Sequence, residues 1–70
     1  MFKEYRNKQN LTQEKLSNIT NLDIRTIQRI ENEERLPSIE SLAKLILVLK
    51  IPDEVVLKYI KSFAKIKVAE

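Results

Sequence analysis

The sequence predicts an all-α fold of five helices. Apolar residues recur at spacings of three and four along most of the chain, which is the periodicity of amphipathic helices. The 70 residues include no glycine and only two prolines, so few positions interrupt a helix. A chain of this length forms one small domain, residues 1–70, because it can bury only about 60% of its unfolded surface.

Capping residues and prolines predict where four of the helices begin. Thr12, Asp23 and Ser38 each precede an apolar repeat, and their side-chain oxygens can accept hydrogen bonds from the free N–H groups of a first helical turn. Pro52 and Asp53 suit the start of the last helix, since proline fits the first turn and an acidic side chain favours the helix dipole. The expected helices span about residues 2–9, 13–19, 24–32, 39–50 and 53–67.

The last two helices each carry an apolar stripe. The spacing predicts that the fourth helix buries Ile39, Leu42, Ala43, Ile46 and Leu49. The fifth helix has more apolar residues than the core of so short a chain needs, so some of them are expected to cover the fourth helix and the others to form a two-fold interface. The candidates for that interface are Ile60, Phe63 and Ile66.

Composition excludes several classes of function. The chain has no histidine, cysteine or glycine, so it lacks the usual general base, the strong metal ligands and any glycine-rich phosphate loop. We therefore expect no enzymatic activity, no cofactor and no small-molecule ligand. The longest apolar run, 45–49, is far shorter than a membrane span, and the absence of cysteine fits a reducing cytoplasm. The net charge of +3 is too small to identify a partner by itself.

Only a short turn separates the second and third expected helices. A connection of three to four residues can hold two helices at about 90–120°, as in a helix-turn-helix. Such a turn needs one residue at positive φ, and Asn21 is the best non-glycine candidate because its short amide tolerates the left-handed region.

The segment LTQEKLSNITNLDIRTIQRIENEERLPSIESLAKLILVL, residues 11–49, resembles the Xre or Cro/C1-type helix-turn-helix domain of phage and bacterial repressors. The matching elements are LTQE..L, the isoleucines of TIQRIE, and PSIESLAKL. The resemblance implies a double-stranded DNA partner, a homodimer and a bacterial or phage-encoded cytoplasmic protein. Asn21 and Glu33 depart from it, since the family usually has glycine in the turn and often after the third helix. The second departure is expected to lengthen the third helix or to alter the following loop.

In the fold that the resemblance implies, the third helix enters the major groove. Its outer face carries the expected base-contacting residues, which are Ile24, Arg25, Gln28 and Arg29. Arg25 can donate two hydrogen bonds to guanine, and Gln28 can bind adenine or a phosphate or remain merely solvated. Arg29 has a base, a phosphate or a neighbouring glutamate as possible partners. Ile24 is either an overflow of the core or a contact for a thymine methyl group.

A second set of residues is expected to contact phosphates. Gln13 begins the second helix, where free backbone N–H groups already favour an anion, and the resemblance implies a phosphate contact there. Thr26 has a phosphate, a base or a local backbone hydrogen bond as alternatives. Asn32 and Arg35 are expected to bind the next phosphate from the loop, although Glu33 and Glu34 beside them would repel DNA if they face it, or meet a partner subunit instead.

The resemblance also implies an ion pair between Arg6 of the first helix and Glu31 at the end of the third.

Two functions remain open at this point. The chain is either a dimeric DNA-binding transcriptional regulator, most simply a repressor on a palindromic operator, or a protein-interaction module such as an antitoxin or anti-repressor partner. The aligned polar residues on the outer face of the third helix favour the first.

Overall fold

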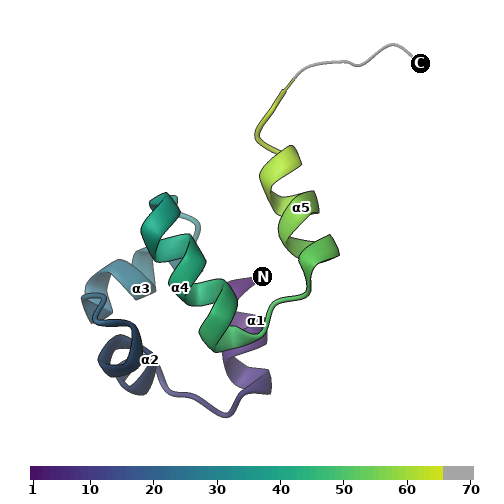
Figure 1. Cartoon of the computed structure of the whole chain (residues 1–70). Helices are drawn as coiled ribbons and strands as arrows, with labels where there is room; N and C mark the ends of the chain where they lie inside the picture. The colour runs from purple at the N-terminus through teal and green to yellow at the C-terminus, as the bar shows by residue number, and fades with distance from the viewer. Residues whose placement is uncertain (66–70) are drawn as a thin grey trace.

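Five helices follow one another in the computed structural model, which describes residues 1–65. They are α1 (Phe2–Lys8), α2 (Gln13–Thr20), α3 (Ile24–Glu31), α4 (Ile39–Leu49) and α5 (Asp53–Lys61). Figure 1 shows α2 and α3 together on one side, α5 on the opposite side and α4 between them. No helix in the described range is long and apolar enough to cross a membrane.

The predicted helix starts are confirmed, and three of them are capped as expected. The hydroxyls of Thr12 and Ser38 accept hydrogen bonds from backbone N–H groups three residues later, both at 3.1 Å, and the Asp23 carboxylate accepts one from the N–H of Arg25 at 2.8 Å. The first four helix ends agree with the prediction to within one residue. These helix boundaries are therefore determined largely by local sequence.

The predicted end of the fifth helix is wrong. Helix α5 ends at Lys61 rather than at residue 67, and the Ser62 hydroxyl donates a 2.6 Å hydrogen bond to the carbonyl of Tyr59. The N–H of Phe63 bonds to the carbonyl of Ile60, which tightens the last turn, and Lys65 then adopts a left-handed φ of 53°. The side chains of residues 61–65 are all exposed, so they make no core contact that would sustain the helix.

The core lies between the first four helices and the start of α5. Its most deeply buried side chains, all less than 2% exposed, are Leu16, Ile27, Leu45 and Leu49. Phe2 and Val56 extend the core towards α5, where Tyr59 packs edge-on against Phe2 with ring centroids 5.4 Å apart. Helix α5 is thus attached to the core through Val56 and Tyr59, one on each half of the helix.

The predicted buried face of α4 is partly wrong. Leu42 and Leu49 are buried and Ile46 is half-buried, but Ile39 is 82% exposed and Ala43 is also exposed. Leu45 takes their place in the core. The five consecutive apolar residues at 45–49 leave the angular position of the buried face undetermined by pattern alone, and packing against α1 and α2 selects it.

Helices end at left-handed residues although the chain contains no glycine. Asn10, Asn21, Glu33 and Lys50 follow α1, α2, α3 and α4, with φ between 54° and 59°. After α3, the N–H of Glu34 bonds to the carbonyl of Arg29 at 2.9 Å and the N–H of Glu33 to that of Ile30 at 3.2 Å. This is a Schellman motif, which needs a left-handed residue at the position of Glu33. Helix α3 therefore ends at Glu31, and the absence of glycine after it does not lengthen the helix.

Candidate nucleic-acid interface

Helices α2 and α3 form a helix-turn-helix held by side-chain hydroxyls. Asn21 has the predicted left-handed conformation, with φ 58° and ψ 26°. The Ser17 hydroxyl donates to the carbonyl of Leu22 at 2.6 Å, and the buried Thr20 hydroxyl donates to the carbonyl of Leu16 at 2.7 Å while accepting from the N–H of Leu22 at 3.3 Å. Sequence reasoning missed Ser17 and Thr20 because isolated hydroxyl residues within a helix carry no distinctive pattern.

The outer face of α3 presents the residues expected to contact bases. Arg25, Gln28 and Arg29 are exposed, and Ile24 is 39% exposed at the first position of the helix. Ile27 and Ile30 are buried beneath them. Among the described residues, neither Arg25 nor Arg29 forms an ion pair, so both guanidinium groups are available to a ligand.

Gln13 connects the two helices of the motif. Its side-chain nitrogen donates a 3.0 Å hydrogen bond to Oε1 of Glu31, and its oxygen accepts a long 3.5 Å hydrogen bond from Nε2 of Gln28. An amide nitrogen carries two hydrogens, so one remains for a phosphate oxygen. The structure therefore places Gln13, at the start of α2, beside Gln28 in the middle of α3.

Arg6 and Glu31 form a buried ion pair. The Nε and Nη2 atoms of Arg6 lie 2.6 and 3.1 Å from the two carboxylate oxygens of Glu31, in the two-pronged geometry that suits a guanidinium. The Nη1 atom donates to the carbonyl of Leu11 at 2.8 Å. The side chains are only 10% and 3% exposed, so this pair ties α1 to the end of α3 away from solvent.

The other expected phosphate contacts lie on α3 and in the loop that follows it. Thr26 is half-buried, and its hydroxyl makes no hydrogen bond within residues 1–65. Asn32 caps the end of α3, and Arg35 is exposed in the loop that follows. The two loop residues follow the end of α3 that is opposite to Ile24.

The arrangement of α2, the turn and α3 defines a helix-turn-helix protein with a lambda-repressor-like fold. The model of the helix-turn-helix family HTH_3 matches residues 2–56, and the chain therefore belongs to this family, which is the Cro/C1 or Xre type. No curated protein and no solved structure matches the chain significantly.

Membership of this family has direct consequences for function. The family is a non-enzymatic family of DNA-binding domains, which agrees with the exclusion of an enzyme by composition. DNA binding and a part in transcriptional regulation follow from the family. The matched segment contains α1 to α4 and the start of α5, so the motif and its supporting ion pair both lie within it.

Proposed function

We propose that the chain is a sequence-specific transcriptional repressor that binds a palindromic operator as a homodimer. The observation that carries the proposal is the exposed row of Arg25, Gln28 and Arg29 on α3, in which neither arginine forms an ion pair within residues 1–65 and Gln28 lies beside Gln13. A module that bound only other proteins would not need these hydrogen-bond donors on the face that the fold presents to the major groove.

Each outward residue of α3 has a chemical preference in the groove. Arg25 donates two hydrogen bonds to O6 and N7 of guanine, and Gln28 pairs with N6 and N7 of adenine. Ile24 offers methyl groups to the C5-methyl group of thymine. Arg29 lies one turn beyond Arg25 and contacts either the next base or a phosphate. Gln13 limits the rotation of the Gln28 amide through the hydrogen bond between them and so reduces the entropy lost on binding.

Phosphate contacts position the motif on the duplex. Gln13 uses its remaining N–H together with the free backbone N–H groups of the first turn of α2. Thr26, Asn32 and Arg35 add contacts along the same strand. Repression follows if an occupied operator overlaps the site where polymerase binds.

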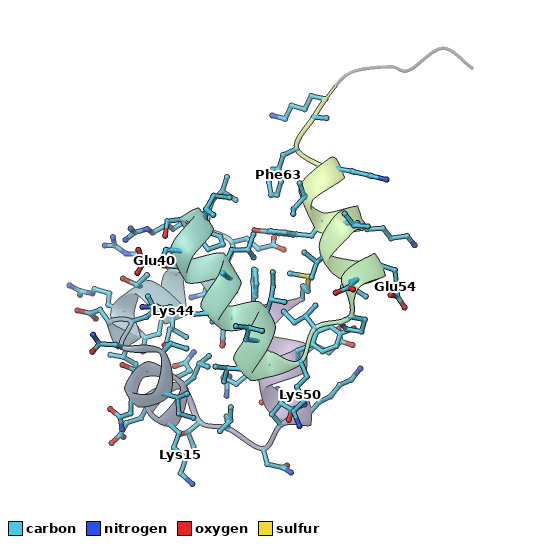
Figure 2. All side chains as sticks on the ribbon, viewed as in Figure 1. Lys15, Glu40, Lys44, Lys50, Glu54 and Phe63 are labelled. Atoms are coloured by element: carbon cyan, nitrogen blue, oxygen red, sulfur yellow. The ribbon has the colours of Figure 1, made fainter. Side chains whose placement is uncertain are left out.

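The dimer is proposed to form through α5 and the start of α4. Ile60 and Phe63 are 47% and 45% exposed, and Figure 2 shows Phe63 on the side of α5 that faces α4. Together with Leu36, Pro37, Ile39, Leu42 and Tyr59 they line an open apolar groove of about 200 Å³. A second copy that inserts its own α5 would cover this groove, and binding of two half-sites requires the two α3 helices to lie ~34–36 Å apart. Ile66, the third candidate, lies outside the described residues.

The test begins with selection of bound sequences from random duplexes, followed by titration of the best duplex across a salt series. Affinity should fall steeply with salt because each neutralised phosphate releases counterions. Arg25→Ala should lose about 1–3 kcal/mol of discrimination at one base pair in each half-site. Gln13→Ala should weaken binding to every sequence and also relax the preference at the base that Gln28 contacts.

A matched control is Lys58→Ala, which removes one exposed positive charge from α5, away from the motif. It should leave the selected sequence unchanged. A flat salt response, or no binding at micromolar protein, would refute DNA recognition and favour the protein-interaction module. For the dimer, Phe63→Lys should shift the protein to monomer in sedimentation equilibrium, and an unchanged mass would refute the interface.

A further inference from the structure

The loop between α3 and α4, residues 32–38, is held by hydrogen bonds only at its two ends. At its start the N–H groups of the Schellman motif bond to carbonyls of α3, and at its end the Ser38 hydroxyl caps α4. Within the described residues 1–65, positions 35–37 make no hydrogen bond. The middle of the loop carries the expected phosphate contact Arg35, and it is therefore positioned by side-chain packing.

Leu36 is the loop residue that lines two neighbouring hollows in the surface. One is the open groove of about 200 Å³ between α4 and α5, and the other is a cavity of about 390 Å³ beside Glu33, between the start of α1, the loop and the end of α5. Tyr59 and Phe63 of the α5 region also line both. Leu36 is nevertheless 62% exposed, so packing within a single chain leaves most of this side chain uncovered.

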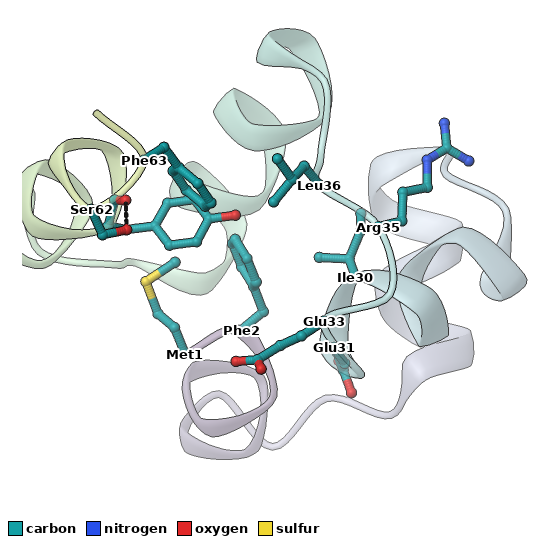
Figure 3. Close-up of a pocket in the computed structure, with 10 residues that line it drawn as sticks. Met1, Phe2, Ile30, Glu31, Glu33, Arg35, Leu36, Ser62 and Phe63 are labelled. Atoms are coloured by element: carbon teal, nitrogen blue, oxygen red, sulfur yellow. Dashed lines mark hydrogen bonds between the residues drawn. The ribbon is translucent and has the colours of Figure 1, made fainter. Parts of the chain in front are cut away.

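The side chains of Leu36 and Arg35 leave the loop on opposite sides. Figure 3 shows Leu36 directed towards Phe63, whereas the guanidinium of Arg35 points away from that ring. Leu36 precedes Pro37, and a residue before proline is restricted to an extended backbone, in which neighbouring side chains project to opposite sides. The position of Leu36 therefore determines where the charge of Arg35 is presented.

We propose that Leu36 is a positioning residue that couples dimerisation to a phosphate contact. When a second copy covers the groove, Leu36 is enclosed, the middle of the loop is fixed, and Arg35 is held ready for the DNA backbone. A side chain fixed before binding loses less entropy when the contact forms. The inference rests on the proposed dimer and the proposed DNA contact, and it adds that the two are linked. By this linkage DNA should also strengthen the dimer.

The coupling is measured on a short duplex that contains one half-site, so that a dimer gains nothing from binding two half-sites at once. The monomeric form is Ile39→Gln combined with Ile60→Gln. Both isoleucines are exposed and line the groove but not the cavity, so the fold, the cavity and the net charge should be preserved. Sedimentation equilibrium at the titration concentrations verifies the mass of each form.

Arg35→Ala is then introduced into the dimeric parent and into the monomeric form. In the dimer it should weaken binding about tenfold, as for loss of a hydrogen bond to a charged group, and reduce the slope of log affinity against log salt by about 1. In the monomeric form it should leave the affinity and the slope unchanged within error, because the loop does not hold Arg35 in place.

Leu36 itself is tested with two replacements and a control. Leu36→Ala should abolish the effect of Arg35→Ala on affinity and on the salt slope. Leu36→Met keeps an apolar side chain of similar volume and should preserve that effect. Leu57→Ala is the matched control, because Leu57 is also an exposed leucine but lines neither hollow, and it too should preserve the full effect.

A second readout needs no DNA. The NMR order parameters of the backbone amides of residues 35 and 36 should be higher in the dimer than in the monomeric form. Equal order parameters, or an equal effect of Arg35→Ala in the two forms, would overturn the coupling and leave the dimer and DNA binding intact. A parent that stays monomeric would refute the proposed dimer, and a parent that binds no duplex would refute DNA recognition. Either of these results would overturn the coupling as well.

Discussion

Removal of one partner of the buried ion pair between Arg6 and Glu31 should destabilise the fold more than loss of any other polar contact that the structure describes. Arg6→Ala removes two hydrogen bonds to Glu31 and one to the carbonyl of Leu11. The Glu31 side chain, 3% exposed, then keeps a negative charge with only Gln13 as a side-chain donor. Breaking a buried pair in this way costs about 3–5 kcal/mol. A chain of 70 residues has a total stability of roughly 4–10 kcal/mol, so much of it would be lost.

Urea unfolding followed by far-ultraviolet circular dichroism measures this loss. The control is Lys8→Ala, which breaks the exposed pair of Lys8 and Glu4, 3.6 Å apart, and the contact of the Lys8 ammonium with the Tyr5 ring, and should cost no more than about 1 kcal/mol. Replacing both partners, as Arg6→Met with Glu31→Leu, should be less harmful than Arg6→Ala because no charge is left buried. If the free energy of unfolding of Arg6→Ala is within about 1 kcal/mol of the parent value and DNA binding is nevertheless abolished, then Arg6 acts on DNA and the structural assignment is refuted.

Three further predictions concern the two ends of α4 and the phenol of Tyr59. Lys50→Gly should stabilise the fold by up to about 1 kcal/mol in urea unfolding, because Lys50 has φ 54° and glycine removes the left-handed penalty. Ser38→Ala should cost about 1 kcal/mol in the same assay, since it removes the oxygen that caps α4. Burial, and secondarily the Glu33 charge, raises the pKa of Tyr59 above 10.0. The native state therefore keeps a proton that the unfolded chain loses, so stability should fall as pH rises from 10.0 through the raised value, in step with tyrosinate absorbance.

Helix starts were predictable because the signals that set them are local. Thr12, Asp23 and Ser38 each act on the first turn of the following helix, within three residues, and the structure shows all three bonds. The end of α5 was not predictable in this way. Its apolar repeat continues past Lys61, and whether such a repeat remains helical depends on a surface to pack against, which lies elsewhere in the chain or in a partner.

The candidate site likewise has one part that follows from the local sequence and another part that depends on how the helices pack. That the outer face of α3 carries Arg25, Gln28 and Arg29 follows from helical periodicity once Ile27 and Ile30 are assigned to the core. The contacts of Gln13 with two residues of α3 depend on the angle between helices, and no spacing in the sequence encodes that angle. The same is true of the cavity beside Glu33, which is formed by three distant segments.

Glu31 connects the stability of the fold to the geometry of DNA recognition. A buried carboxylate must have its acceptor sites occupied, so the positions of Arg6 and Gln13 are determined by a structural requirement. Once the Gln13 nitrogen is held by Glu31, its oxygen is directed towards Gln28 on the exposed face of α3. The Gln13 amide beside the proposed base-contacting Gln28 is therefore oriented by a charge in the protein interior before DNA is bound. It follows that Glu31→Gln, which keeps the shape but not the charge, should weaken the hold on Arg6 and Gln13 together and should alter both the free energy of unfolding and the base preference at Gln28.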